Sequence, residues 1–380
     1  MKSEKIPGLY IHIPFCLSKC PYCDFYSSTS LSAFPHFLEG LFKEMEGYRG
    51  QFTPFDTIYI GGGTPSLLNP QQLESILVKA RTSFEFLSNS ERTPEVTIET
   101  NPADLNKVFL QSMRAIGINR INIGVQSFDD GVLHFLGRRH STEQAVSAIE
   151  ASRDAGFSNL GLDLIYAVPG QNLYSWLDTL RKAIAFSPEH LSCYQLTLEA
   201  ETRLGMRYRA GEFSIPGEEL QYQFFVKTSE FLENAGYLHY EVSNFARGRE
   251  YTSRHNQKYW DHSPYLGLGP AAHSFRSNRR WWNPRSLERY LSAIGTGNLP
   301  LEDAETLTGD QLRLEAIYLG LRTKKGIDLR DFKDRHQYDL LAEKKETLSV
   351  LLENRLLTLQ DGVLFPTREG LGVADRLALI

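Results

Sequence analysis

The feature that most constrains the fold of this chain is a regular alternation of short β-rich runs and longer helical patterns through residue 200. The predicted strands are 9–15, 57–62, 96–100, 118–126, 160–168 and 191–198, with helices near 34–49, 70–88, 104–116, 129–153 and 173–186. Several strands are almost wholly apolar, as expected when both faces of a parallel sheet are covered. Such a repeat builds either an open doubly wound sheet or a partial or complete barrel, and periodicity alone does not separate the two.

The alternation stops after residue 200, where a second kind of organisation begins. A helix near 217–235 leads into 239–245, and the aromatic, Gly-rich and Asn-rich region 249–284 gives no clear secondary structure. The last part reads as helices (305–323, 328–335, 340–354), a hairpin around Asp361-Gly362 and a final helix. We therefore predict a barrel at 1–235, an extension and linker at 236–300, and a winged-helix-like α+β domain at 301–380.

The charge and hydropathy of the chain exclude several kinds of partner. Its formal net charge is −5, so no basic excess exists to neutralise a nucleic-acid backbone. No apolar run approaches the roughly 20 residues that span a bilayer, and the first residues lack the apolar core of a signal peptide. We expect a cytoplasmic protein that does not bind nucleic acid.

Polar residues gather at or beyond the ends of the predicted strands. In both candidate architectures, ligands bind at the carboxyl ends of parallel strands. The residues in these positions are Gly61, Gly62, Gly63, Thr64, Glu99, Gln126, Asp163 and Thr197.

Three of the four cysteines, Cys16, Cys20 and Cys23, follow the first predicted strand with CxxxCxxC spacing. Clustered thiols in a reducing compartment indicate metal or redox chemistry rather than disulfides. Four thiolates saturate a [4Fe–4S] cluster, so three leave one iron open. Radical S-adenosylmethionine proteins use that iron to chelate the amino and carboxylate groups of their cofactor, whose cleavage by one electron gives a 5′-deoxyadenosyl radical.

Two alternatives concern the ligands of this site. A zinc site normally has four ligands and CxxC spacing, and Asp24 or His12 would have to complete it. Cys193 is a candidate fourth cluster ligand, but it lies inside an apolar predicted strand. A buried free cysteine is the better interpretation of that residue.

At this point the chain resembles the oxygen-independent coproporphyrinogen III oxidase-like family of radical S-adenosylmethionine proteins, and within it the haem chaperone branch. The resemblance covers essentially the whole chain and rests on LYIHIPFCLSKCPYCDF, IYIGGGTPS, TIETNP, IGVQSF, LGRRH, DLIYAVPGQ, HNQKYW and LGLGPAAHSF. It implies a partial (β/α)6 barrel. It also implies cofactor or substrate contacts by Tyr10, Tyr22, Gly62, Gly63, Thr64, Glu99, Gln126, Arg138, Asp163 and Thr197.

Each of these roles has an alternative. The glycines are equally compatible with a tight turn. Glu99 and Asp163 are carboxylates in apolar strands and need a cation, a hydroxyl or a ligand as partner. Either Arg138 or Arg139 suits a surface ion pair instead.

Two features distinguish the sequence from the oxidases. The oxidases carry a fourth cysteine two residues after the third, where this chain has Phe25. The oxidases also have an amino-terminal extension, for which the nine residues before Tyr10 are too few. In its place, His255-Asn-Gln-Lys-Tyr259-Trp260 matches the HNxxYW signature of the chaperone branch. We predict haem binding by His255, Tyr259 and Trp260, because a neutral imidazole is a standard axial ligand.

Alternatives remain open here too. In the alternative interpretation, His255 is a loop histidine that is hydrogen-bonded to the backbone and does not bind haem. His273 is a second candidate for haem binding, or instead belongs to the mouth of the active site. Trp281 and Trp282, beside Arg279 and Arg280, form either a lip, a protein contact or a packed surface patch.

Two functions compete on these observations. The first is a chaperone that binds haem, a [4Fe–4S] cluster and S-adenosylmethionine, and delivers haem to an acceptor protein, with a membrane-associated respiratory protein as one candidate. The second is a radical enzyme that decarboxylates coproporphyrinogen III or modifies haem. The sequence leaves the oligomeric state open, a homodimer included.

Overall fold

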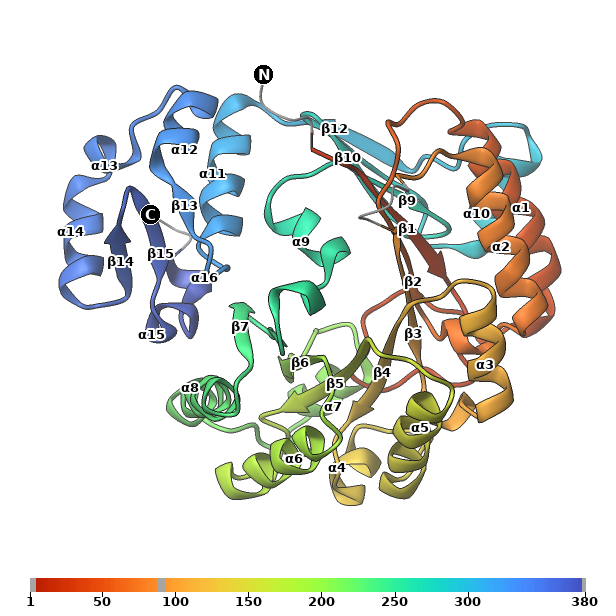
Figure 1. Ribbon diagram of the computed structural model, residues 1–380, viewed down its shortest axis with the longest axis horizontal. Coiled ribbons are helices and arrows are strands. Elements are labelled where there is room, and N and C mark those ends of the chain that lie inside the picture. Colours follow the sequence, from red (N-terminus) through yellow and green to blue (C-terminus); the bar gives the residue numbers. More distant parts are fainter. Residues whose placement is uncertain (1–4, 88–92, 378–380) are drawn as a thin grey trace.

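The computed structural model describes residues 5–87 and 93–377 and contains a large curved sheet. Its twelve strands follow the order β12-β11-β10-β9-β1-β2-β3-β4-β5-β6-β8-β7. The six central strands are parallel: β1 (Gly8–Ile13), β2 (Thr57–Gly62), β3 (Glu95–Thr100), β4 (Arg120–Gln126), β5 (Leu160–Tyr166) and β6 (His190–Gln195). Figure 1 shows this sheet curving with helices along its outer side, which is the predicted partial (β/α)6 barrel.

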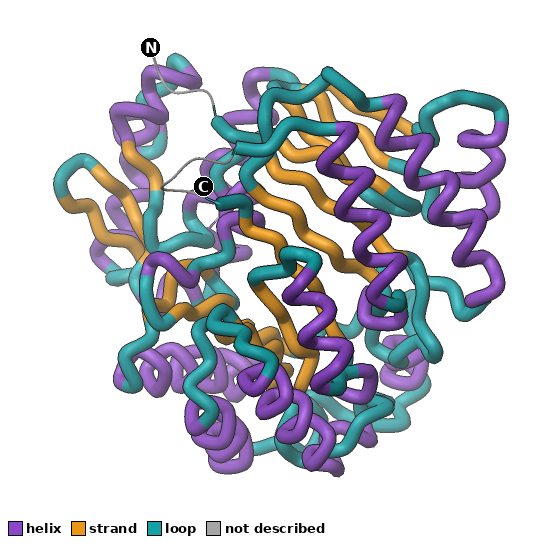
Figure 2. Tube along the Cα trace, turned by 45° about the vertical axis from the view of Figure 1, so that its right-hand side comes forward, coloured by secondary structure: helices purple, strands orange, loops and turns teal. Residues whose placement is uncertain are grey.

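Helices connect successive parallel strands. They are α1 (Phe34–Gly47), α2 (Pro70–Ser83), α3 (Lys107–Ala115), α4 (Asp130–Phe135), α5 (Thr142–Asp154) and α6 (Leu173–Ala185), with 3-10 turns at Leu31–Ala33, Pro65–Leu67 and Pro102–Asp104. In Figure 2, α1 to α3 run across the outer face of the strands.

Two predicted helices differ from the structure. The single helix at 129–153 is wrong: the chain breaks at Gly137, which has a φ of +63°, and restarts where Ser141 caps α5 through the N–H of Gln144. The helix at 70–88 ends earlier, at Ser83, because Phe84 is extended. Residue 88 lies outside the described residues.

The strands direct apolar side chains outward and polar ones inward. Leu9, Ile11 and Ile13 of β1 are fully buried beneath the helices, while the alternate residues Tyr10 and His12 face the interior of the barrel, because side chains of a strand alternate. Since all six strands are parallel, their carboxyl ends share one edge. The cysteine loop follows β1 at that edge.

The region that gave no clear prediction from sequence forms the flank of the sheet beside β1. It follows α7 (Arg203–Arg209), α8 (Glu218–Asn234), β7 (Leu238–Glu241) and β8 (Asn244–Ala246). It contains the turn Arg249–Tyr251, α9 (Arg254–Trp260), β9 (Tyr265–Leu268), β10 (His273–Arg276) and β11 (Arg279–Trp282). After it come α10 (Leu287–Gly295) and β12 (Asp303–Thr306). β9 pairs parallel to β1, and β10 to β12 continue antiparallel. The described sheet ends at β12 and β7, which do not pair, so the barrel stays open.

The C-terminal part is a smaller α+β unit with its own core, formed by residues such as Leu321, Phe332 and Leu364. It comprises α11 (Gly309–Gly320), β13 (Ile327–Asp328), α12 (Leu329–His336), α13 (Leu340–Glu343), α14 (Lys345–Glu353), β14 (Leu357–Gln360), β15 (Val363–Pro366), α15 (Arg368–Leu371) and α16 (Ala374–Leu377). Helices followed by an antiparallel hairpin agree with the winged-helix-like prediction. The expected helix at 305–323 starts later, because residues 305–306 belong to β12, and the helix at 340–354 is divided at Lys344. The division at residues 235 and 300 stays a prediction.

Among the described residues, no helix is both long and apolar enough to cross a membrane.

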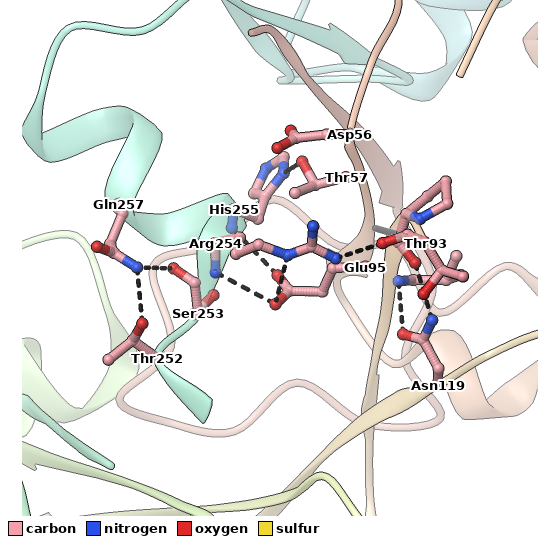
Figure 3. A network of polar contacts seen from close by, with 12 residues as sticks. Asp56, Thr57, Thr93, Glu95, Asn119, Thr252, Ser253, Arg254, His255 and Gln257 are labelled. Atoms are coloured by element: carbon pink, nitrogen blue, oxygen red, sulfur yellow. Dashed lines mark hydrogen bonds and ion pairs between the residues drawn. The ribbon is translucent and has the colours of Figure 1, made fainter. Parts of the chain in front are cut away.

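The helix α9, which carries HNQKYW, is held against the amino ends of the barrel strands (Figure 3). The carboxylate of Glu95, the first residue of β3, accepts the backbone N–H groups of Arg254 and His255 at 3.2 and 3.1 Å. These N–H groups lie in the first turn of α9 and have no partner within the helix. A negative charge at this end also stabilises the helix dipole.

Two further contacts secure α9. His255 Nδ1 lies 2.8 Å from Oγ1 of Thr57, the first residue of β2. Lys258 Nζ lies 2.6 Å from Oδ1 of Asp56, with the two side chains only 8% and 4% exposed, and donates to the carbonyl of Ile6. HNQKYW therefore closes the end of the barrel opposite the cysteine loop, about 16 Å away along β2 at roughly 3.3 Å per residue.

We predict that Glu95→Ala destabilises the protein, because two helix N–H groups and Arg254 lose their acceptor. The free energy of unfolding, measured by urea denaturation, is expected to fall by about 1–3 kcal/mol. The matched control is Glu150→Ala on the exposed side of α5, which should change it by less than about 0.5 kcal/mol. Equal effects of the two variants would contradict this role of Glu95.

Candidate functional site

The three cysteines lie on a loop whose two ends are hydrogen-bonded to each other. The N–H of Cys16 donates to the carbonyl of Ser28 at 3.0 Å, and that of Cys23 donates to the carbonyl of Cys20 at 3.2 Å. All three thiols are half-buried. Burial raises the pKa of the Cys23 thiol, and the neighbouring Cys20 and Cys16 raise it further.

The segment after β2 lies directly against this loop. Thr64 Oγ1 donates to Cys16 Sγ at 3.3 Å, and the N–H of Gly63 donates to the carbonyl of Ile13 at 2.8 Å. A Cβ on Gly63 would lie 2.5 Å from the carbonyl oxygen of Phe15, and Gly62 has a φ of +108°. Glycine is therefore required here for close approach and for backbone conformation.

Arg138 connects the cysteine loop to the barrel. Its Nη1 lies 3.5 Å from Cys20 Sγ and 3.4 Å from the Tyr22 hydroxyl, and its Nη2 donates to the carbonyl of Gly124 at 2.8 Å. Arg139 instead pairs with Asp104 at 3.0 Å. Of the two arginines, Arg138 reaches the loop and Arg139 forms the ion pair.

The described residues do not group the ligands that a single zinc ion needs. Zinc needs three or four ligands around one ion, and no set of three His, Cys, Asp or Glu side chains in the described ranges is so arranged. Each thiolate of a cubane binds a different iron, so its ligands lie farther apart. His12 is engaged as well, with Nδ1 3.0 Å from the Tyr10 hydroxyl and Nε2 2.9 Å from the Tyr26 carbonyl.

Cys193 is a buried free cysteine in β6, as its apolar surroundings predicted.

The two predicted carboxyl groups, those of Glu99 and Asp163, are buried inside the barrel. Glu99 accepts from the Tyr59 hydroxyl at 2.7 Å and from the N–H of Gly62 at 3.1 Å. Burial, together with the nearby Asp163, raises its pKa to about 7. Burial raises the pKa of Asp163 to about 6, and its Oδ1 is buried without a hydrogen-bond partner in the described structure. Both groups have remaining capacity to bind a ligand.

The other two predicted cofactor residues are Gln126 and Thr197, at the end of β4 and beyond β6. Gln126 ends β4 with a φ of +64°, and Thr197 is exposed beyond β6. No described contact joins either to a cysteine, and their contacts with S-adenosylmethionine stay predictions.

A cavity of about 680 Å³ occupies the open side of the barrel. It is lined by Tyr10, His12, Asp24, Phe25, Tyr26, Tyr59, Glu99, Tyr194, Glu241, Val242, Ser243, Asn244, His255, Asn256, Tyr259, Trp260, Tyr265, Ala271, His273 and Arg285. These residues come from the cysteine loop, the barrel interior, both flanks of the sheet and α9. The cavity therefore extends between the two ends of the barrel.

The predicted haem residues lie at the α9 end of this cavity. Tyr259 and Trp260 are half-buried, whereas His255 is only 1% exposed. Both ring nitrogens of His255 have partners: Nδ1 lies against Thr57 and Nε2 lies 2.9 Å from the Tyr259 hydroxyl. Burial, and then Lys258, lower its pKa to about 3, so the ring is neutral. Iron ligation by His255, which stays a prediction, requires the bond to Tyr259 to open.

Several lining residues were missed by the sequence interpretation. Tyr59 had a readable signal, because it alternates with buried Ile58 and Ile60 along β2. Glu241 and Asn244 had no signal in the sequence, since only the β7–β8 turn brings them to the cavity. The two predicted tryptophans have different environments. Trp281 is packed and donates to the Tyr48 hydroxyl at 2.9 Å, whereas Trp282 stacks on His273.

Comparison with known proteins agrees with this geometry. Residues 10–183 match the Radical SAM superfamily and residues 307–373 match the HemN C-terminal domain. The fold superposes on the structure of coproporphyrinogen III oxidase (HemN) from Escherichia coli with a TM-score of 0.84 and 22% identity, covering 99% of this chain and 90% of that chain. The chain thus contains a Radical SAM superfamily domain within a HemN-like fold.

Its sequence relatives specify the family more narrowly. Heme chaperone HemW of Lactococcus lactis is 33% identical over 356 residues, which are 93% of this chain and 91% of that protein. Heme chaperone HemW of Bacillus subtilis is 31% identical over 366 residues, 95% of each. The chain belongs to the HemW family.

We predict that Cys20→Ser abolishes loading of the cluster, because the remaining thiols bind too few irons. Cys193→Ser is the matched control, since that thiol lies in β6 away from the loop. Iron and sulfide contents and the visible spectrum after anaerobic reconstitution provide the measurement. Equal iron in both variants would refute the ligand assignment.

A second prediction concerns Glu99, whose pKa in the folded protein is about 7 against an ordinary value of 4.5. A raised pKa contributes stability below the ordinary value, and this is lost as pH rises through the folded value. Glu99→Gln has no titrating group at this position, so its stability does not show this fall with rising pH. The free energy of unfolding of the variant minus that of the native protein should therefore rise by up to about 3 kcal/mol between pH 4.5 and about pH 8. Urea denaturation at both pH values measures it, and a constant difference would contradict the prediction.

Proposed function

We propose that this protein is a haem chaperone that binds haem in the cavity on the open side of the barrel and delivers it to an acceptor protein. The supporting observation is the extent of the cavity, which joins the cysteine loop to Tyr259 and Trp260 of HNQKYW. Aromatic side chains line much of its length, and such rings suit the flat faces of a porphyrin.

The cluster and S-adenosylmethionine belong to the same proposal. Cys16, Cys20 and Cys23 would hold the cluster, which supplies one-electron chemistry when bound. Thr64 and Arg138 orient two of the thiols through contacts with their sulfur atoms. The remaining predicted residues, Tyr10, Tyr22, Gly62, Gly63, Glu99, Gln126, Asp163 and Thr197, would contact S-adenosylmethionine.

The residue that replaces the fourth cysteine supports a chaperone. Phe25 is 67% exposed and lines the cavity beside the loop. An exposed phenylalanine offers a surface for an apolar macrocycle, and it stands where the oxidases carry their fourth cysteine. Haem binding is therefore favoured over decarboxylation.

A radical enzyme acting on a porphyrin is the second candidate. Glu99 favours it, because a carboxyl group with a pKa of about 7 lines the cavity. Such a group can take up or release a proton near neutral pH.

We further propose that the protein acts in the cytoplasm and does not bind nucleic acid. The acceptor protein would approach the open side of the barrel, where haem leaves. A membrane-associated respiratory protein is one candidate acceptor, and a homodimer is one candidate assembly.

One assay discriminates between the two functions. Anaerobically reconstituted protein receives reductant, S-adenosylmethionine and either coproporphyrinogen III or haem. We expect haem to bind, with a shifted Soret band, and coproporphyrinogen III to stay unchanged by chromatography. Conversion of coproporphyrinogen to protoporphyrinogen, with one 5′-deoxyadenosine formed per decarboxylation, would overturn the chaperone proposal.

A further inference from the structure

Three histidines line the cavity, and two of them are fully engaged. His12 is 3% exposed and bonds Tyr10 and Tyr26. His255 is 1% exposed and bonds Thr57 and Tyr259. Neither presents a free ring nitrogen to the cavity in this arrangement.

The third, His273, differs in its exposure and in its hydrogen bonding. It is the first residue of β10, its side chain is exposed, and its ring nitrogens form no hydrogen bond within the described structure. Burial of part of the ring, and then Arg280 and Arg285, lower its pKa below the ordinary value. The ring is therefore neutral at physiological pH, the form in which imidazole binds a metal.

The structure also fixes the orientation of this imidazole. His273 pairs across the β10–β11 hairpin with Trp282, and the two rings stack with centroids 5.6 Å apart and planes 24° apart. β10 also packs closely against β9, since a Cβ on Gly267 of β9 would lie 2.1 Å from the carbonyl oxygen of His273. A ring supported on one face needs little ordering to bind a ligand.

His273 belongs to the cysteine-loop end of the cavity. Arg285, which lines the cavity with it, donates to the carbonyl of Asp24 at 2.7 Å. The same nitrogen, Nη2, also lies 3.4 Å from Asp24 Oδ1 in an ion pair. The Arg285 side chain is still 60% exposed, so its other donors are available to a carboxylate. An imidazole, a cation and the exposed ring of Phe25 thus line the same cavity.

We propose that His273 is the axial ligand of the haem iron and that Arg285 pairs with a haem propionate. This inference rests on the proposed haem chaperone function and assigns its ligand. It places the macrocycle beside the cysteine loop, with Tyr259 and Trp260 at the far end of the cavity. His255 then anchors α9 and does not contact iron.

The test is a haemin titration of the reconstituted protein and four variants, followed by absorbance. His273→Ala should lose the Soret shift of the wild type and bind haemin about tenfold or more weakly, and added imidazole should restore the shift. His255→Ala should keep the Soret position while lowering the melting temperature. His36→Ala, an exposed histidine on α1, is the matched control and should resemble the wild type.

The outcomes separate the inference from the function on which it rests. If His273→Ala retains the wild-type Soret position and affinity, the ligand assignment is wrong while the haem chaperone proposal stands. Loss of the shift in folded, iron-loaded His255→Ala, with His273→Ala unaffected, would return the ligand role to HNQKYW. If the wild type gives no Soret shift, both proposals fail. Arg285→Ala should weaken haemin binding without moving the Soret band.

Discussion

The parallel pairing of β1 with β2 is the constraint on which the rest of the structure depends. Because Gly8 pairs with Thr57 and Ile13 with Gly62, the cysteine loop and the glycine segment leave the sheet at the same edge. That edge brings Thr64 and Arg138 to the thiols of Cys16 and Cys20. The same pairing places Thr57 at the other end of the strand, where α9 is bound.

An open barrel gives this protein a cavity with two unlike ends. One end carries the cysteine loop, and the other is closed by α9, whose first turn is bound by Glu95. Between them, the edge strands β12 and β7 are not paired, so the barrel stays open on that side. Cluster and haem therefore share one space in this account, while the buried contacts of His255 and Lys258 maintain its floor.

The sequence predicted the parallel strands well, because apolar runs such as β2 and β4 are long enough to carry a signal. Through motif resemblance, it predicted the cysteine loop and also that Arg138, rather than Arg139, contacts the site. It did not predict β9 to β11, whose four-residue strands are rich in Arg, Trp and Gly and are stabilised by pairing with distant residues. For the same reason, the sequence did not show that both ring nitrogens of His255 have hydrogen-bond partners, or that those of His273 have none among the described residues. Both facts depend on contacts between remote segments.

The central claim is that haem binds within the open side of the barrel near the cysteine loop. Anomalous diffraction from iron in crystals of the reconstituted, haem-loaded protein tests it most directly. The account predicts an isolated iron peak inside the cavity, next to the imidazole of His273, and a separate cluster peak at the three thiols. An isolated iron peak outside this cavity, on the C-terminal unit or the outer helices, would contradict it.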